Sequence, residues 1–163
     1  MKEWNWADIE LLCLDFDGTI TDNYVYTFQD GSEAVRSTRA DGIGLERLLH
    51  FGVAVYVISS EDNPVVAARC RKLRLPYKMG VRDKEEEVRY QAGRLAIPLE
   101  NIAFMGNDVN DLPALQAVGL PILVRDATPQ LVKACIAKVE LRWWTTAARG
   151  GDGAVREICE MII

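Results

Sequence analysis

Several short runs of this chain are apolar at nearly every position, and amphipathic stretches separate them. The clearest runs cover residues 11–16, 53–58, 102–105 and 121–124. Successive side chains of a strand point to opposite faces, so a wholly apolar strand is buried on both sides. This pattern is typical of a parallel sheet with helices on both faces. The sequence therefore predicts an α/β fold built on a doubly wound parallel sheet.

The segments between these runs carry helix signals. Asn63 and Thr128 are N-cap residues, each followed by a proline at the first helical position. We expect one helix to open at Asp41–Gly42 and end before Gly52, with Leu45, Leu48 and Leu49 on one face. Further helices are expected over 64–73, 84–96, 111–118, 128–137 and 153–161.

A short aromatic segment, 24–28, precedes the turn 29–32, and Val35 begins a plausible return strand. This arrangement predicts a small β-hairpin flap. We find no repeat, linker or low-complexity segment, so residues 1–163 are expected to form a single domain.

Composition removes several function classes. The net charge of −5 argues against a nucleic-acid partner or an anionic membrane surface. No apolar run is long enough for a transmembrane helix, and residues 1–10 do not resemble a signal peptide. A single histidine argues against His-rich metal sites and Ser-His-Asp triads. The four cysteines form no C-x-x-C pair, and Cys13 is expected to be a buried thiol, which favours a cytoplasmic protein.

Polar residues collect where the predicted strands end. Alone, each would be a cap, a turn residue or a solvated lysine. Parallel strands bring such residues to one edge of the sheet, where ligands bind. Carboxylates gathered there repel one another unless a cation intervenes, and hard oxygen ligands favour Mg²⁺. The residues are Asp15, Asp17, Thr19, Ser59, Ser60, Glu61, Asn107, Asp108, Asn110 and Asp111, with Lys84 at a helix start.

Asp15 and Asp17 project to the same side of an extended segment because they are two residues apart. One carboxylate can attack phosphorus while the other handles protons. Lys84 and a metal would neutralise phosphoryl oxygens, and Ser59 would donate a hydrogen bond to them.

Four segments of the chain resemble, in their order and spacing, the four motifs of the haloacid dehalogenase superfamily of phosphatases. They are Asp15-Phe16-Asp17-Gly18-Thr19, Ser59, Lys84 and Gly106-Asn107-Asp108-Val109-Asn110-Asp111. The resemblance implies that Asp15 is the nucleophile and a Mg²⁺ ligand. Asp17 would be the general acid/base and bind Mg²⁺ through its backbone carbonyl, while Ser59 and Lys84 hold the phosphoryl group.

The last motif departs from the pattern of many members, because Asn107 stands where they have aspartate. A neutral amide oxygen can still coordinate Mg²⁺, only more weakly. Asn107 and Asp108 therefore both remain candidate ligands, and Asp111 is expected to orient them.

Residues 20–58 and 60–83 leave no room for a cap domain. In its size and lack of a cap, the chain resembles the phosphatases that act on 2-keto-3-deoxy sugar acid phosphates. Their substrates are 3-deoxy-octulosonate 8-phosphate and the nonulosonate 9-phosphates. The chain also resembles the C-terminal domain of some CMP-sialic acid synthetases. The resemblance implies a homotetramer in which a neighbour closes the site over a small anionic sugar acid phosphate.

Glu61, Arg69 and Lys72 fall at spacings similar to those of the nine-carbon members, in which the Arg and Lys come from a neighbouring subunit. We therefore favour a nonulosonate (sialic acid type) 9-phosphate, with the eight-carbon substrate as the alternative. The candidate substrate-binding residues are Thr19, Arg39, Ser60, Glu61, Arg69 and Lys72. The segment 149–157 resembles the glycine-rich tail of this subgroup, and we expect it, Arg69 or Lys72 to reach a neighbour's site.

Aromatic residues of the hairpin, Tyr24, Tyr26 and Phe28, would be costly to expose together, which also favours an oligomer. Trp143 and Trp144 are expected in core or interface rather than at a ligand. A non-catalytic tetramerisation module remains an alternative, motivated by Asn107. A phospho-receiver domain is disfavoured because Ser59 and Ser60, not an aspartate, end the second strand.

Overall fold

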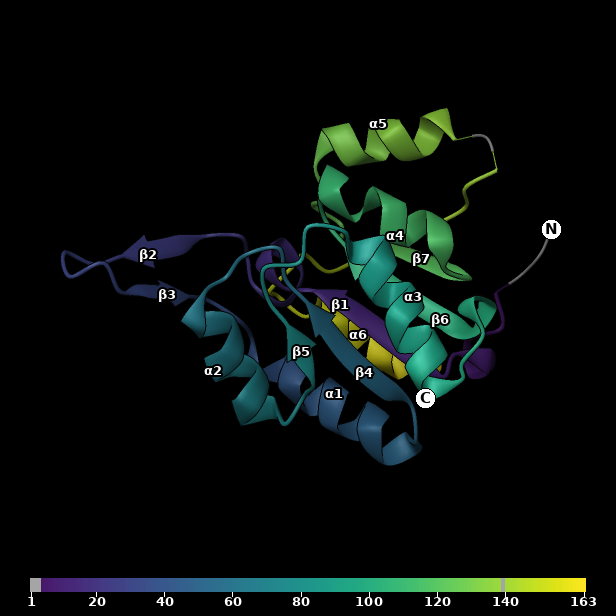
Figure 1. Cartoon of the computed structure of the whole chain (residues 1–163), viewed down its shortest axis with the longest axis horizontal. Helices are drawn as coiled ribbons and strands as arrows, with labels where there is room; N and C mark the ends of the chain where they lie inside the picture. The colour runs from purple at the N-terminus through teal and green to yellow at the C-terminus, as the bar shows by residue number, and fades with distance from the viewer. Residues whose placement is uncertain (1–3, 139) are drawn as a thin grey trace.

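Six parallel strands form the central sheet of the computed structural model, which describes residues 4–138 and 140–163 (Figure 1). Each strand pairs with its neighbours in parallel, as the sequence predicts. In spatial order the strands are β5 (Tyr77–Lys78), β4 (Ala54–Ile58), β1 (Leu11–Asp15), β6 (Ile102–Gly106), β7 (Leu120–Leu123) and β8 (Trp144–Thr145).

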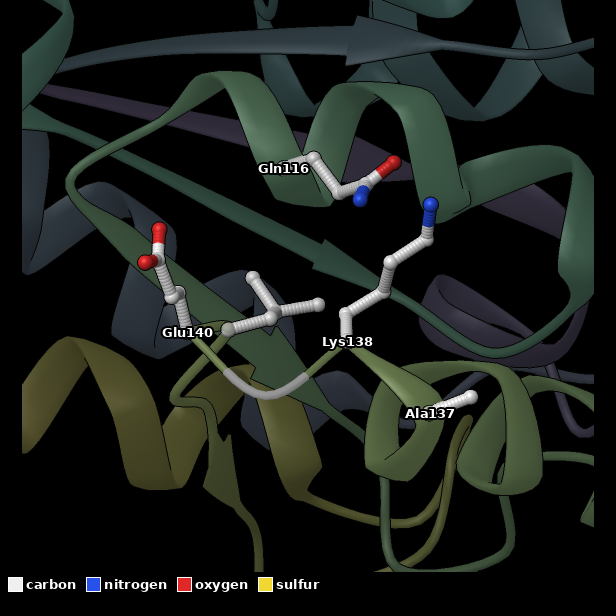
Figure 2. A pocket seen from close by; sticks show the side chains of 5 residues that line it. Gln116, Ala137, Lys138 and Glu140 are labelled. Atoms are coloured by element: carbon white, nitrogen blue, oxygen red, sulfur yellow. The ribbon is translucent and has the colours of Figure 1, made fainter.

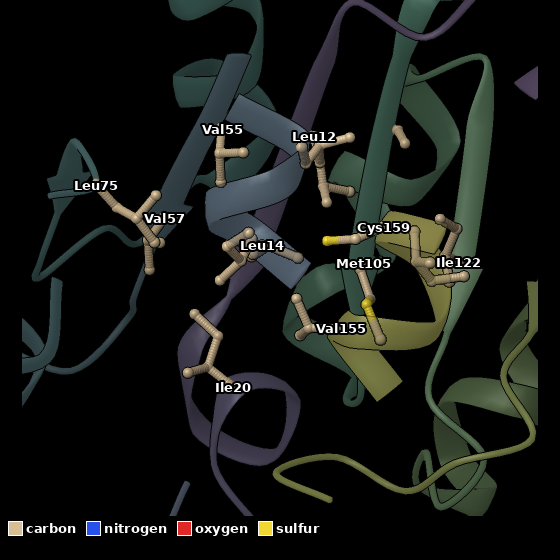
Figure 3. Packing of buried hydrophobic residues seen from close by; sticks show 14 of the residues in the cluster. Leu12, Leu14, Ile20, Val55, Val57, Leu75, Met105, Ile122, Val155 and Cys159 are labelled. Atoms are coloured by element: carbon tan, nitrogen blue, oxygen red, sulfur yellow. The ribbon is translucent and has the colours of Figure 1, made fainter. Parts of the chain in front are cut away.

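Both faces of the sheet are covered, so the expected doubly wound architecture is confirmed. Leu12 and Leu14 of β1 lie in one core, together with side chains of α6 such as Val155 (Figure 3). Leu11 and Cys13 lie in the core on the opposite face. Helices α1 (Arg39–Phe51), α2 (Pro64–Leu73) and α6 (Ala154–Ile162) contribute to the first core. Helices α3 (Lys84–Leu95), α4 (Leu112–Ala117) and α5 (Pro129–Ala137) contribute to the second.

The predicted hairpin is confirmed. Strands β2 (Val25–Thr27) and β3 (Glu33–Val35) pair antiparallel and extend away from the body of the molecule (Figure 1). Residues 20–58 otherwise hold α1 and β4, and residues 60–83 hold α2 and β5. Neither segment contains a cap domain.

Some element boundaries differ from those expected. Helix α1 begins at Arg39 rather than at Asp41, because Thr38 caps it and its hydroxyl accepts a hydrogen bond from the Ala40 amide. Asp41 is consequently buried inside the first turn. Leu49 is half exposed instead of sharing the buried face of Leu45 and Leu48.

Strand β8 is an element that the sequence analysis missed. Its Trp144 packs edge-on against Trp6, with ring centroids 5.3 Å apart, and against Trp4. This contact places Trp144 against the core, as expected for that residue.

All four cysteines are buried and free. Burial raises the pKa of the Cys13 thiol far above its ordinary value, so this thiol stays protonated. Among the described residues, no helix combines the length and the apolar character needed to cross a membrane. Met1–Glu3 of the N-terminal segment lie outside the described residues.

Candidate active site

The carboxyl ends of β1, β4 and β6 meet at one edge of the sheet. Asp15 is level with Ile58 of β4, and Leu14 is level with Met105 of β6. The three loops that follow these strands therefore start side by side. They are the loops that carry the candidate catalytic residues, as the parallel arrangement requires.

A lysine between two aspartates forms the centre of this edge. The ammonium Nζ of Lys84 lies 2.5 Å from Asp15 Oδ1 and 2.6 Å from Asp111 Oδ1. Lys84 is the first residue of α3, and Asp83 caps that helix. Although a helix start is usually exposed, Lys84 is only 1% exposed. Charges removed from water are costly unless they are paired, and two carboxylates share one cation here. With both carboxylates ionised, the centre would hold one negative charge more than the lysine balances.

This imbalance appears in the pKa of Asp15. Burial, together with the nearby Asp111 charge, raises it to about 8, while Lys84 opposes the change. Burial acts against the charged form of Lys84, but its ion pairs with Asp15 and Asp111 raise the pKa of this lysine above its ordinary value. A divalent cation beside Asp15 would favour the ionised carboxylate. The centre is thus poised to accept further positive charge.

The loop after β1 turns sharply at Gly18, where φ is +84°. A Cβ at this position would lie 2.0 Å from Nδ2 of Asn107, so no larger residue fits beneath the third loop. Asp17 is half-buried. Burial and the neighbouring Glu61 raise the pKa of its carboxyl, with Lys84 opposing. A carboxyl with a raised pKa is suited to donate a proton and then to accept one.

Asp111 organises the loop after β6. Its Oδ2 accepts hydrogen bonds from the Asn107 amide at 2.8 Å and the Asp108 amide at 3.2 Å. A Cβ on Gly106 would lie 2.4 Å from this same oxygen, which explains the glycine. Both carboxylate oxygens of Asp111 are therefore occupied, whereas the side chain of Asp108 accepts from Thr128 Oγ1 at 2.9 Å.

These loops surround a polar cleft of about 210 Å³. A second cleft of about 280 Å³ adjoins it beneath the hairpin and shares three of its residues. The first is lined by Asp15, Asp17, Asn23, Ser60, Glu61, Asn107, Asp108 and Asn110. The second is lined by Asp17, Asn23, Tyr24, Val25, Glu33, Val35, Glu61 and Asn63.

Two residues of the clefts had no role in the candidate site: Asn23 was not among the candidates, and Asn110 was placed at the strand ends without a function. Asn23 lines both clefts and has a left-handed backbone, with φ of 68°. Asn110 donates to Ser60 Oγ at 3.1 Å across the mouth of the first cleft. Asparagine tolerates left-handed backbone, so the T-D-N sequence after the first motif was a weak signal for Asn23.

Most predicted residues of the motifs meet at this edge, and Thr19 lies behind it. Thr19 is fully buried and its Oγ1 has no described partner, so its contact with substrate stays a prediction. Its carbonyl oxygen accepts a hydrogen bond from the Gly151 amide. Ser59 is buried behind the cleft, where its Oγ accepts from the Glu61 amide at 3.1 Å and its hydroxyl hydrogen remains free to donate.

The three predicted basic residues line neither cleft of this chain. Arg39 and Lys72 are exposed on α1 and α2. Arg69 instead donates from Nη2 to the Thr38 carbonyl oxygen at 3.1 Å. Their expected contribution to a neighbour's site stays a prediction.

Gly150 and Gly151 of the glycine-rich segment after β8 pack against residues 18–22 of their own chain, beneath the first loop. The expectation that segment 149–157 reaches a neighbour's site stays a prediction.

A cation at this edge would be held by oxygen atoms alone. Among the described residues, no three acidic, histidine or cysteine side chains form a metal-binding group. Carboxylate oxygens of Asp15 and Asp108 would need the amide oxygen of Asn107 or the backbone carbonyl of Asp17 beside them. Such a mixed set of hard oxygens suits Mg²⁺ and does not suit zinc.

A wider hollow of about 540 Å³ lies between α4 and the end of α5 (Figure 2). Its polar side chains are those of Gln116, Lys138 and Glu140. It lacks a paired carboxylate, and it is lined by none of the motif residues. We therefore place the chemistry at the strand ends despite the smaller size of that cleft.

The chain is similar to proteins of one known family. Residues 80–140 match the family described as haloacid dehalogenase-like hydrolase. The 3-deoxy-D-manno-octulosonate 8-phosphate phosphatase of Escherichia coli K12 is 32% identical, over 96% of this chain and 80% of that protein.

Solved structures give the same result. The corresponding phosphatase of Yersinia pestis has a TM-score of 0.88 at 30% identity, covering 96% of this chain and 82% of that one. The Moraxella catarrhalis phosphatase, solved with magnesium, phosphate and the eight-carbon sugar acid, has a TM-score of 0.86 at 28% identity, covering 96% and 87%. With its motifs, sheet and relatives in agreement, this chain belongs to the haloacid dehalogenase-like hydrolases, among the capless phosphatases of that family.

Proposed function

We propose that this chain hydrolyses the phosphate ester of a 2-keto-3-deoxy sugar acid through an aspartyl-phosphate on Asp15, with Mg²⁺ as cofactor. The observation that carries the proposal is the buried Asp15–Lys84–Asp111 centre behind a polar cleft. A carboxylate held against a lysine, with a second acid two residues away, suits attack on a phosphoryl group rather than simple binding.

Each residue has a distinct part in this mechanism. Asp15 attacks phosphorus as Asp17 protonates the departing sugar oxygen, and Asp17 then takes a proton from the water that hydrolyses the intermediate. Lys84 compensates the charge of the phosphoryl oxygens, and Ser59 donates to one of them. Asp111 holds the third loop in register with Lys84.

Magnesium, when bound, supplies charge neutralisation at the phosphoryl oxygens. We assign it to Asp15, the backbone carbonyl of Asp17, and Asn107 or Asp108. Asn107 lies against Gly18 of the nucleophile loop, which supports its assignment as the direct ligand. Asp108, already bound to Thr128, would then act through the loop.

The relatives named above act on 3-deoxy-octulosonate 8-phosphate, which makes this eight-carbon compound the first substrate to test. A nonulosonate 9-phosphate is the second. The spacing of Glu61, Arg69 and Lys72, which is similar to that of the nine-carbon members, supports the longer substrate. Glu61 lines both clefts.

The second cleft supports an oligomeric active form. Its charged lining residues are acidic, namely Asp17, Glu33 and Glu61. A sugar carboxylate entering it needs a cation from elsewhere, and exposed basic side chains such as Lys72 of a second copy would provide one. We accordingly propose a cytoplasmic homotetramer of single-domain subunits, with Arg39, Arg69 and Lys72 facing a neighbour's cleft.

The test is a comparison of kcat/KM for the eight- and nine-carbon sugar acid phosphates, with Mg²⁺ and with a chelator. We expect phosphate release that requires the metal and prefers one of these substrates by at least about tenfold over simple sugar phosphates. Turnover that ignores the chelator would refute the metal assignment. Absence of turnover on every substrate would favour the non-catalytic assembly module.

A further inference from the structure

The turn between β8 and α6 lies directly beneath the nucleophile loop. The amide of Gly151 donates to the Thr19 carbonyl oxygen at 3.0 Å. A Cβ on Gly150 would lie 1.9 Å from the Gly18 carbonyl oxygen, and one on Gly151 would lie 2.3 Å from the Asp22 amide. The two backbones are therefore in contact with no side chain between them, and a movement of one displaces the other.

Carboxylates from three elements hold this turn in place. Asp126 accepts from the Gly150 amide at 2.9 Å. Glu157 of α6 accepts from the amides of Ala147 and Ala148, also at 2.9 Å. These contacts fix the start and the middle of the turn, and the third carboxylate, from a different helix, acts at its end.

That third group is Asp41 of α1, which is 1% exposed. Its Oδ1 accepts a hydrogen bond from the Arg156 amide, in the first turn of α6, at 2.8 Å. Helix α6 has no side-chain cap of its own, because Gly153 occupies the N-cap position. Asp41 thus supplies from α1 the acceptor that the first turn of α6 needs.

The close packing of α1 on α6 makes this contact rigid. A Cβ on Gly44 would lie 3.1 Å from the Arg156 Cα, so the helices touch one turn beyond Asp41. The second oxygen of Asp41, Oδ2, is buried without a described partner. Burying a carboxylate with one oxygen unpaired costs free energy, and apolar residues packed between the two helices would avoid that cost.

We propose that Asp41 is a positioning residue for phosphoryl transfer, which fixes the start of α6 and so holds the Gly150–Gly151 turn against the backbone at Gly18 and Thr19. This inference rests on the proposed function. The backbone that it supports follows Asp17 directly, so release of the turn changes the placement of Asp17 relative to Asp15. Displacements of about 1 Å in such groups cost up to about a hundredfold in rate.

The experiment compares Asp41→Ala with Asp41→Asn in the full chain. Asparagine keeps an oxygen acceptor at Oδ1, and alanine removes it. With p-nitrophenyl phosphate and Mg²⁺, we expect kcat of Asp41→Ala to fall by about tenfold or more while KM stays within about twofold. Asp41→Asn should retain kcat within about threefold. Hydrogen exchange should accelerate in residues 16–22 and at Gly151 in the alanine variant alone.

A matched control separates positioning from general destabilisation. Leu48→Ala creates a cavity in the same helix, at a fully buried site in the core. It should lower the melting temperature without accelerating exchange in residues 16–22 relative to the rest of the chain, and without lowering kcat below that temperature. Unchanged exchange at residues 16–22 in Asp41→Ala, or an equal kcat loss in Leu48→Ala, would overturn the proposal. Because exchange needs no turnover, it also decides the matter if the proposed function fails.

Discussion

Two regions of the molecule depart from the usual pattern of burial: one buries charged side chains, and the other exposes large apolar rings. At the strand ends, Lys84, Asp15 and Asp111 are 1%, 5% and 0% exposed, although each can carry a charge. In the hairpin, Tyr24 and Tyr26 are 74% and 61% exposed, although each carries a large apolar ring. Stability alone explains neither region. Burying charged groups costs free energy, and so does exposing large apolar rings to water.

The two regions differ in whether their side chains find partners within one chain. The charged centre is complete, since each member pairs with another within the same chain. The hairpin is incomplete, since its aromatic rings meet no core in this chain. The charged centre therefore forms within one subunit, whereas we propose that a second surface covers the hairpin and encloses the substrate.

The most severe way to break the charged centre is Asp15→Ala. This change removes the proposed nucleophile, and we expect kcat to fall by at least about a thousandfold. The protein should remain folded, because Lys84 and Asp111 then form a balanced pair. Phosphate release and the urea midpoint measure the two effects, and substantial turnover by this variant would contradict the nucleophile assignment.

Lys84→Met breaks the same centre from its other side. It leaves two buried carboxylates without their shared cation, so the free energy of unfolding should fall by about 3 kcal/mol and kcat by about a hundredfold. Lys133→Met, at an exposed position of α5, is the control and should change neither quantity. A stable and active Lys84→Met protein would show that the ion pairs are dispensable.

The hairpin is tested by the triple variant Tyr24→Ser, Tyr26→Ser and Phe28→Ser. These rings bury little in this chain, so the stability of the isolated subunit should change by less than about 1 kcal/mol. The oligomer should dissociate, and KM for the sugar acid phosphate should rise by about tenfold. Sedimentation velocity gives the assembly state, with Tyr90→Ser on α3 as an equally exposed control. An unchanged oligomer would remove the hairpin from the interface.

The last expected effect is a pH dependence of the free energy of unfolding that comes from Asp41. Burial raises the pKa of this carboxyl to about 6, with the charge of Asp152 adding to the shift, while the amides of Arg156 and Gly153 and the charge of Arg69 oppose it. Since the folded pKa exceeds the ordinary value of 3.8, ionised Asp41 destabilises the fold. This cost is absent below pH 3.8 and complete above about pH 6.

Asp41→Asn should therefore gain stability relative to the wild type as pH rises from about 4 to about 7, by at most about 3 kcal/mol. Urea unfolding at several pH values measures this difference. A constant difference across that range would show that Asp41 does not titrate as described.

The sequence predicted the sheet and the charged centre because both depend on local patterns. Apolar runs such as 53–58 identify buried strands, and Asp15, Asp17 and Lys84 lie in motifs at the ends of predicted elements. Contacts between distant segments were not predictable in this way. No pattern near Thr19 in the sequence predicts that the Gly151 amide donates a hydrogen bond to its carbonyl oxygen, or that Thr19 is fully buried. Strand β8 was missed because two residues are too few for a periodic pattern.

The central claim is that the charged centre performs Mg²⁺-dependent hydrolysis of a sugar acid phosphate through Asp15. Its most direct test is phosphate release from 3-deoxy-octulosonate 8-phosphate and a nonulosonate 9-phosphate, by the wild type and Asp15→Ala side by side, with Mg²⁺ or a chelator. We predict metal-dependent release by the wild type alone, from at least one of the two substrates. Equal release by both proteins, or none from either substrate with Mg²⁺ present, would contradict the account.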